Sequence, residues 1–108
     1  MSADRGTVVF ATDPFKRDAG RPFLVISDTE TPFHGDQYIT LALTTRTWYD
    51  DRIELSDDDW VDGGAPKSSS IMPWSVNAVD DDWVSHEQGR LRDDVVRRGI
   101  DRLHAYLE

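Results

Sequence analysis

The sequence predicts a mainly β domain that ends in one helix, either an α+β fold or a small barrel covered by that helix. Most of the chain consists of short runs rich in β-branched and aromatic residues, separated by Pro, Gly and Asp. Only the last segment has apolar residues at helical spacing. Strands grouped before a helix do not fit alternating βαβ units. Because 108 residues suit one domain, we expect a single domain over residues 1–108.

Three strands are predicted in the first half of the chain. Residues 7–11 (TVVFA) form a short β-type run that ends before an Asp-Pro pair. The run 23–27 (FLVIS) is almost continuously apolar, which is typical of a buried strand. Residues 28–36 contain a Pro and a Gly and are predicted to form a loop. The run 38–45 (YITLALTT) has the strongest strand character because it is rich in β-branched and aromatic residues.

The second half adds shorter predicted strands. Residues 52–55 (RIEL) alternate between polar and apolar and predict the next strand. A Ser followed by three Asp predicts a capped turn over residues 56–60. Segments 69–72 and 76–79 are predicted as two separate strands. Pro73 lies between them and has no backbone N–H for a sheet, so it indicates a bend or an edge.

The C-terminal segment is predicted to be a helix. Its apolar residues recur at i, i+4, i+7 and i+11 and therefore share one face: Val96, Ile100, Leu103 and Leu107. Asp93 and Asp94 at the start suit the positive end of a helix dipole. Gly99 inside the helix costs about 1 kcal/mol relative to Ala, unless a neighbouring element packs closely against it.

The charge composition indicates adaptation to a salty environment. The chain has 21 acidic and 12 basic residues and a net charge of −9; Asp outnumbers Glu 17 to 4, and Arg outnumbers Lys 10 to 2. Repulsion among like charges destabilises a compact state in dilute buffer, but at molar salt the Debye length is only ~3 Å. We therefore favour a protein of a very salty cytoplasm over an ordinary acidic protein. The negative charge then serves solvation and does not identify a partner.

Several function classes are disfavoured by what the sequence lacks. It has no Cys, which excludes disulfides, thiol nucleophiles and Cys-ligated zinc. It has no run of ~20 apolar residues for a membrane span and no apolar stretch of a signal peptide at its start, so a cytoplasmic location without membrane contact is expected. Gly-rich phosphate loops, HExxH and GxSxG are absent. The three His residues are scattered and predict no metal site: His34, His86 and His104.

The remaining polar features are interpreted as solvated surface. His34 lies in the predicted loop over residues 28–36, and we expect a solvated loop residue rather than a general base. The acidic runs 57–59 and 80–82 resemble metal-binding runs. Contiguous carboxylates point in different directions, however, so we expect both runs to face solvent.

Two arginines flank the two most apolar predicted strands. Arg21 precedes the first of them, and Arg46 follows Thr44 and Thr45 at the end of the second. If these strands pair, both guanidinium groups and both hydroxyls lie at one rim. A guanidinium has five donors in a fork that fits phosphate. The alternative is that Arg21 pairs with a nearby Asp and the threonines cap a strand end.

The order of the segments resembles a known family over nearly the full length. The segments are Arg5–Ala11 (RGTVVFA), Gly20–Ser27 (GRPFLVIS), Ala42–Thr45 (ALTT), Ser69–Val79 (SSIMPWSVNAV) and Gly89–Leu91 (GRL) before the terminal helix. In this order and near this spacing, they resemble the MazF/PemK family of toxin ribonucleases. The resemblance implies a small SH3-like β-barrel with a C-terminal helix, and usually a homodimer.

The same resemblance implies an activity and a site. It implies the toxin of a type II toxin–antitoxin system: an endoribonuclease that cuts single-stranded RNA without a metal or other cofactor, leaving a 2′,3′-cyclic phosphate, and that a cognate antitoxin protein inhibits. The family's catalytic Arg and Thr map onto Arg21 and Thr44. Trp74 is expected either to stack on a splayed base or to lie in the core or an interface. The RNA-binding residues expected beside the catalytic pair are Thr45, Arg46, Trp74, Lys16 and Arg17.

Two other interpretations stay open at this point. The family's Gln-Ile-Arg-Thr-Ile stretch is replaced here by Ser75–Val79 (SVNAV). The loss of that Gln and Arg, together with a net charge of −9, favours a catalytically degenerate SH3-like binding module of the same fold. The third interpretation is a structural or assembly subunit, which nothing in the sequence specifically supports.

Overall fold

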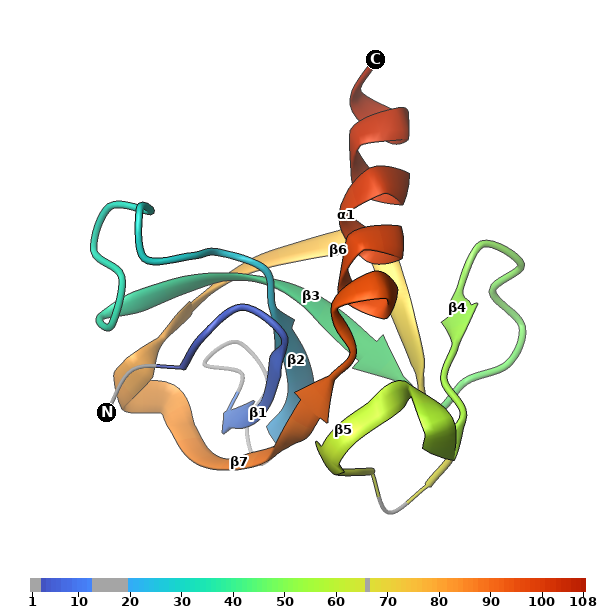
Figure 1. Ribbon diagram of the computed structural model, residues 1–108, viewed down its shortest axis with the longest axis horizontal. Helices are drawn as coiled ribbons and strands as arrows, with labels where there is room; N and C mark the ends of the chain where they lie inside the picture. The colour runs from blue at the N-terminus through green and yellow to red at the C-terminus, as the bar shows by residue number, and fades with distance from the viewer. Residues whose placement is uncertain (1–2, 13–19, 66) are drawn as a thin grey trace.

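The computed structural model describes residues 3–12, 20–65 and 67–108 and contains a curled antiparallel sheet with one long helix (Figure 1). Seven strands have the spatial order β4-β6-β3-β2-β1-β7-β5. The elements in chain order are β1 (Thr7–Thr12), β2 (Gly20–Val25), β3 (Gln37–Thr44), β4 (Ile53–Glu54), the 3-10 turn η1 (Asp57–Asp59), β5 (Trp60–Gly63), β6 (Ser70–Asp80), the 3-10 turn η2 (Asp81–Trp83), β7 (Val84–Leu91) and α1 (Asp93–Leu107). The expected fold class, mainly β with a C-terminal helix, is confirmed.

Apolar side chains cover both faces of the sheet. β3 pairs with β2 on one side and with β6 on the other, so it lies at the centre of the packing. One buried cluster lies beneath α1, and its members include Leu24, Leu41, Leu43, Ile71, Leu91, Val95 and Val96. A second cluster lies on the other side, and its members include Val9, Phe23, Val25, Tyr38, Ala42, Met72 and Val79. Burial on both faces explains why the runs in β2 and β3 are almost continuously apolar.

Helix α1 rests on the sheet through its first half, and its C-terminal half extends beyond the strands (Figure 1). Val95 and Val96 are buried, and Leu107 is 75% exposed. Gly99 has the close neighbour that its position in a helix requires: a Cβ built there would lie 3.2 Å from Cδ1 of Leu41. The missing side chain therefore lets the helix approach β3. Among the described residues, no helix combines the length and the apolar character needed to cross a membrane.

The prediction of two strands around Pro73 is wrong. Residues 70–80 form the single strand β6, and Pro73 is buried within it. The register with β3 slips at this point, because Leu41 faces Val76 whereas Leu43 faces Ile71. A bulge of this kind accommodates a proline, which donates no ladder hydrogen bond, without ending the strand.

Two strands were not predicted. β5 and β7 pair with each other, and β7 also pairs with β1. Both are largely polar and exposed, with sequences WVDG and VSHEQGRL. Their pairing partners supply the strand conformation, which their own composition does not indicate. The turn predicted over residues 56–60 is confirmed as η1, where the carboxylate of Asp59 accepts a hydrogen bond from the backbone N–H of Ser56 at 2.8 Å.

Candidate active site

A small pocket lies where β2 begins and β3 ends. Its volume is about 170 Å³, and it is lined by Arg21, Pro22, Leu43, Thr44, Thr45, Arg46 and Ser69. The antiparallel register of the two strands aligns Phe23 with Ala42. Arg21 lies two residues before Phe23 and Thr44 lies two residues after Ala42, and both residues line this pocket. The predicted rim of Arg and Thr side chains is therefore present, although β2 begins at Gly20, so that Arg21 lies inside the strand rather than before it.

The pocket presents hydrogen-bond donors to a ligand. Thr44 is 6% exposed, and its hydroxyl oxygen accepts a hydrogen bond from the backbone N–H of Arg46 at 3.1 Å. Because that oxygen is the acceptor, the hydroxyl proton is available to donate to a ligand. The alternative that Arg21 pairs with an Asp finds no support in residues 3–12, 20–65 and 67–108, where no ion pair joins Arg21 to a carboxylate. The pocket thus holds a guanidinium and a hydroxyl on facing strands, a combination that suits a phosphoryl group.

Aromatic side chains continue from the pocket along the protein surface. The guanidinium carbon of Arg46 lies 5.1 Å from the ring centroid of Trp48. Ring centroids are 5.8 Å apart between Trp48 and Tyr49, and 5.3 Å apart between Tyr49 and Trp74. We name Trp48, Tyr49 and Trp74 the aromatic strip. Trp48 is 67% exposed and Trp74 is 39% exposed, so Trp74 is not a core residue.

The loop that bears Trp48 and Tyr49 is held in place by arginines. Arg52 donates from Nη1 to the backbone carbonyl of Tyr49 at 2.8 Å and from Nη2 to Glu54 at 2.6 Å. Arg102 of α1 donates to the carbonyl of Asp51 at 3.5 Å. Arg52 is therefore a positioning residue for this loop.

The structure brings together most of the site residues predicted from the sequence. Arg21, Thr44, Thr45 and Arg46 line one pocket, and Trp74 joins it through the aromatic strip. Lys16 and Arg17 lie outside the described residues. Ser69, Trp48 and Tyr49 were missed, although the tripeptide Thr47-Trp48-Tyr49 directly after Arg46 was an available signal for the last two.

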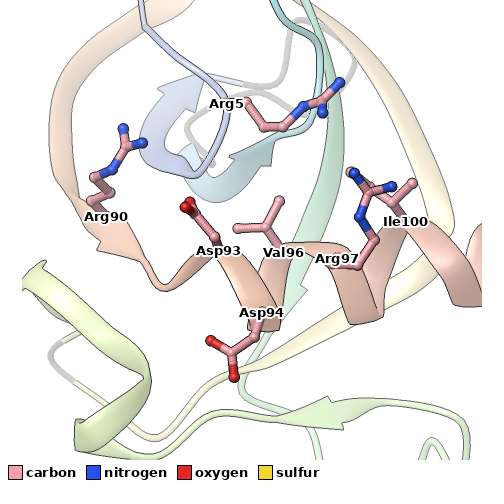
Figure 2. A pocket seen from close by; sticks show the side chains of 7 residues that line it. All are labelled: Arg5, Arg90, Asp93, Asp94, Val96, Arg97 and Ile100. Atoms are coloured by element: carbon pink, nitrogen blue, oxygen red, sulfur yellow. The ribbon is translucent and has the colours of Figure 1, made fainter.

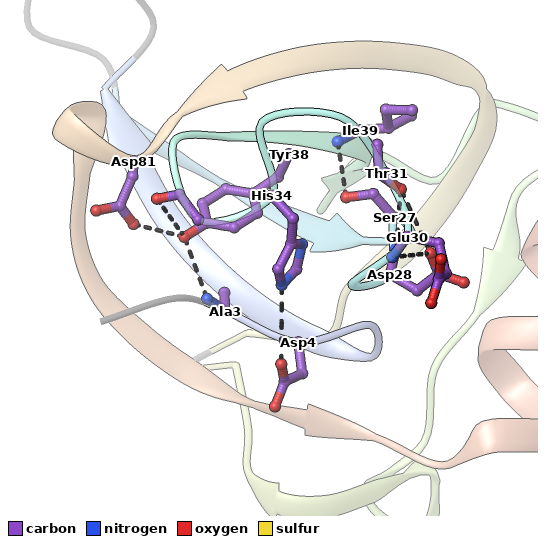
Figure 3. A network of polar contacts seen from close by, with 11 residues as sticks. Ala3, Asp4, Ser27, Asp28, Glu30, Thr31, His34, Tyr38, Ile39 and Asp81 are labelled. Atoms are coloured by element: carbon purple, nitrogen blue, oxygen red, sulfur yellow. Dashed lines mark hydrogen bonds and ion pairs between the residues drawn. The ribbon is translucent and has the colours of Figure 1, made fainter.

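His34 is packed rather than solvated, which corrects the expectation of a solvated loop residue. Its side chain is 11% exposed, and its ring meets that of Tyr38 edge-on with centroids 6.0 Å apart. Nε2 lies 4.0 Å from Oδ1 of Asp4 (Figure 3), and neither ring nitrogen has a hydrogen-bond partner among the residues that the structure describes. His34 lies in the loop before β3, whereas Thr44 is the last residue of β3, and His34 does not line the pocket.

Tyr38 lies beside His34 and forms hydrogen bonds through its hydroxyl group (Figure 3). Its hydroxyl accepts a hydrogen bond from the backbone N–H of Ala3 at 3.1 Å and donates to Oδ1 of Asp81 at 2.6 Å. Burial, reinforced by the carboxylate of Asp81, raises the pKa of Tyr38 above its ordinary value. Neither acidic run has a buried residue, as expected, although Asp81 is half-buried and accepts the hydrogen bond from Tyr38. Among the described residues, no group of three or more His, Asp or Glu is placed to hold a metal ion.

The cavity of about 540 Å³ at the start of α1 is larger but contains none of the predicted site residues (Figure 2). Arginine and aspartate side chains share its walls: Arg5, Arg90, Asp93, Asp94 and Arg97, with Val96 and Ile100 completing the lining. Arg5 is engaged elsewhere, since it donates to the carbonyl of Ile26 at 2.7 Å and to Asp28 at 3.2 Å. Opposite charges in one cavity do not select an anion or a cation, so the small pocket at Arg21 is the better candidate site.

Comparisons with known proteins give the same fold. No protein-family model and no curated protein sequence matches the chain. Among solved structures, the MazE–MazF complex (Form-III) from Deinococcus radiodurans has a TM-score of 0.79 at 17% identity, covering 99% of this chain and 97% of that chain. MazF (Form-I) from the same organism has a TM-score of 0.75 at 16% identity, covering 99% and 97%. An endoribonuclease in complex with its cognate antitoxin from a mycobacterial species has a TM-score of 0.70 at 15% identity, covering 97% and 91%. These likenesses cover 97–99% of this chain, which has the fold of the MazF endoribonucleases.

Proposed function

We propose that this chain is a toxin-type endoribonuclease that cuts single-stranded RNA without a metal ion, as a single domain over residues 1–108. One observation carries the proposal: Arg21 of β2 and Thr44 of β3 line the same pocket, where β2 begins and β3 ends. These are the two positions onto which the catalytic Arg and Thr of the MazF/PemK family map. The shared fold with MazF endoribonucleases supports the same assignment.

The proposed reaction is an internal transesterification. The RNA 2′-oxygen attacks the adjacent phosphorus and loses its proton to solvent, while the bond from phosphorus to the 5′-oxygen breaks and that oxygen takes up a proton. The products are a 2′,3′-cyclic phosphate and a 5′-hydroxyl. Negative charge builds on the nonbridging oxygens in the transition state. Arg21 neutralises this charge, and Thr44 donates a hydrogen bond to one of the nonbridging oxygens. Both residues therefore act by electrostatic stabilisation.

A guanidinium keeps its proton at physiological pH, so Arg21 is assigned no role as a general base. Thr45 and Arg46, which line the same pocket, hold the phosphate backbone beside the scissile bond. Trp74 contacts an unpaired base. Lys16 and Arg17 are proposed to contact RNA from the segment between β1 and β2.

The net charge of −9 is compatible with RNA binding in a salty cytoplasm. At high salt, counterion release contributes little to the affinity of any protein for nucleic acid. Binding then depends on local arginines, hydrogen bonds and base stacking, and the Arg21 pocket with its aromatic neighbours offers all three.

Two partners follow from the fold likeness. Solved neighbours include MazF with MazE and an endoribonuclease with its cognate antitoxin. We expect this chain to form a homodimer and to be blocked by an antitoxin that covers the Arg21 pocket. Because the surface is acidic, we expect the antitoxin to bind mainly through apolar contacts. An affinity that collapsed when salt was raised would contradict this mode of binding.

Mapping the ends of RNA fragments tests the proposal. The purified protein is incubated with an unstructured RNA library, and the new ends are identified chemically. Cyclic phosphates paired with 5′-hydroxyls at recurrent short sequences support the endoribonuclease. A folded protein that leaves RNA intact at every salt concentration, yet binds a protein or peptide, supports the degenerate binding module instead.

A further inference from the structure

We propose that the aromatic strip, with Arg46 at its end, is a stacking site for unpaired nucleobases next to the scissile phosphate. Trp48 and Tyr49 thereby become substrate-binding residues, in addition to Trp74. The inference rests on the proposed function, because it assumes that the Arg21 pocket holds an RNA phosphate.

The geometry connects the two sites through one side chain. Arg46 lines the Arg21 pocket, and its guanidinium lies 5.1 Å from the centroid of the Trp48 ring. Tyr49 bridges the two tryptophans at centroid distances of 5.8 and 5.3 Å. A strand whose phosphate occupies the pocket therefore has its neighbouring bases within reach of this aromatic surface.

Burial shows that the outer rings are not needed by the core. Tyr49 packs against the buried cluster that includes Met72 and Val79. Trp48 stays 67% exposed and Trp74 stays 39% exposed. Two large exposed aromatic side chains flanking a partly buried one form a platform that is anchored at its centre and open at both ends.

Charge favours bases over phosphates as the groups that contact the strip. Asp50 and Asp51 follow Tyr49 directly and are exposed, so they repel a phosphate that approaches this loop. Every nucleobase has a π-face that stacks on indole, phenol or guanidinium planes. The strand is thus oriented with phosphates toward Arg21 and Arg46, and with bases toward Trp48 and Trp74.

This arrangement gives a physical reason for a single-stranded substrate. Bases that are paired in a duplex expose only their edges and cannot stack on the strip. The substrate must therefore contain unpaired bases beside the cleaved bond. Stacking contributes to affinity with little dependence on base identity and with weaker dependence on salt than phosphate contacts have.

Binding of two uncleavable probes tests the inference. The first is a random-sequence, fully 2′-O-methylated RNA of about 12 nucleotides, which has no 2′-hydroxyl to react. The second has the same length and backbone but lacks bases. Affinities are measured in molar KCl for the wild type, Trp48→Ala and Trp48→Phe. Phe33→Ala is the matched control, since Phe33 is 72% exposed and lies before the other end of β3.

Loss of stacking is expected to weaken binding of the base-bearing probe by about 5- to 150-fold in Trp48→Ala. Trp48→Phe is expected to recover most of the affinity, and Phe33→Ala is expected to match the wild type. The probe without bases is expected to bind all four proteins equally weakly. Equal affinity of wild type and Trp48→Ala for the base-bearing probe overturns the inference, as does an equal loss for both probes.

A parallel cleavage assay separates this inference from the proposed function. Cleavage by the wild type together with unaltered probe binding by Trp48→Ala refutes the stacking site and leaves the endoribonuclease standing. Absence of cleavage together with stacking-dependent binding refutes the enzyme and leaves the nucleobase site standing. If the wild type binds neither probe, the strip is not a nucleobase site, and a protein-docking surface takes its place.

Discussion

Arg21 and Thr44 come from the adjacent antiparallel strands β2 and β3 and line the same pocket. The pairing of Phe23 with Ala42 sets this relationship, because Arg21 lies two residues before Phe23 and Thr44 lies two residues after Ala42. The two residues proposed to act on the phosphate are therefore both positioned by strands of the sheet.

Replacing Thr44 by Val is expected to lower the cleavage rate by ~10²–10³-fold, or about 3–4 kcal/mol of transition-state stabilisation. Valine has a similar shape but provides neither the proton donor for the phosphate nor the acceptor for the N–H of Arg46. Thr44→Ser retains both groups and should remain close to the wild type. Single-turnover cleavage measures the effect, with Thr29→Val in the loop between β2 and β3 as the control. A fully active Thr44→Val would remove Thr44 from the mechanism.

Replacing Gly99 by Ala is expected to destabilise the protein despite the better helix propensity of Ala. The gain in propensity is about 1 kcal/mol. The new Cβ would lie 3.2 Å from Cδ1 of Leu41, which is fully buried and has little room to move. Overpacking of this kind costs about 1–3 kcal/mol. Urea denaturation gives the free energy of unfolding, and Gly64→Ala is the control because a Cβ there meets nothing within 4 Å. A stabilised Gly99→Ala variant would show that α1 shifts easily on the sheet.

The raised pKa of Tyr38 predicts a loss of stability at alkaline pH. The folded state holds the phenol proton more tightly than the unfolded chain, so this contribution is complete below the ordinary tyrosine pKa of about 10. It is lost as the pH rises through the higher pKa of the folded state. Tyr38→Phe removes the bonds to Ala3 and Asp81, costs about 1–3 kcal/mol near neutral pH and should show a smaller alkaline decline. Unfolding free energies measured across this pH range test the sign, and identical slopes in both proteins would contradict it.

The free energy of unfolding is expected to rise with KCl concentration. Nine net negative charges repel one another, and the Debye length falls from ~10 Å at about 0.1 M to ~3 Å at about 1 M salt. Sucrose at matched osmolarity controls for effects other than screening. A stability that stayed constant or fell with KCl would refute adaptation to a salty cytoplasm.

The sequence predicts those elements whose own residues carry a clear apolar pattern. β2, β3 and α1 are recognisable because both faces of the two strands and one face of the helix are buried. β5 and β7 were not predictable, since their residues are mostly polar and acquire strand conformation from pairing with each other and with β1. Pro73 led to the prediction of a strand boundary that does not exist. A bulge in the β3–β6 ladder accommodates the proline within one strand.

The same distinction applies to the residues of the candidate site. Arg21, Thr44, Thr45 and Arg46 were candidates because they flank two apolar strands, and the family resemblance then implied catalytic roles for Arg21 and Thr44. Trp48 and Tyr49 were missed because their relation to Trp74 depends on the path of the loop between β3 and β4, which Arg52 and Arg102 fix through backbone carbonyls. No sequence spacing encodes those contacts.

Cleavage of RNA by the wild type and by Arg21→Ala, in molar KCl with EDTA present, tests the central claim most directly. Circular dichroism first establishes that both proteins are folded, and Arg21→Lys separates the need for charge from the need for a planar guanidinium. We predict that the wild type leaves 2′,3′-cyclic phosphates under these conditions and that Arg21→Ala leaves the RNA intact. Cleavage that persists unchanged in Arg21→Ala, or that requires a divalent metal ion in the wild type, would contradict the account.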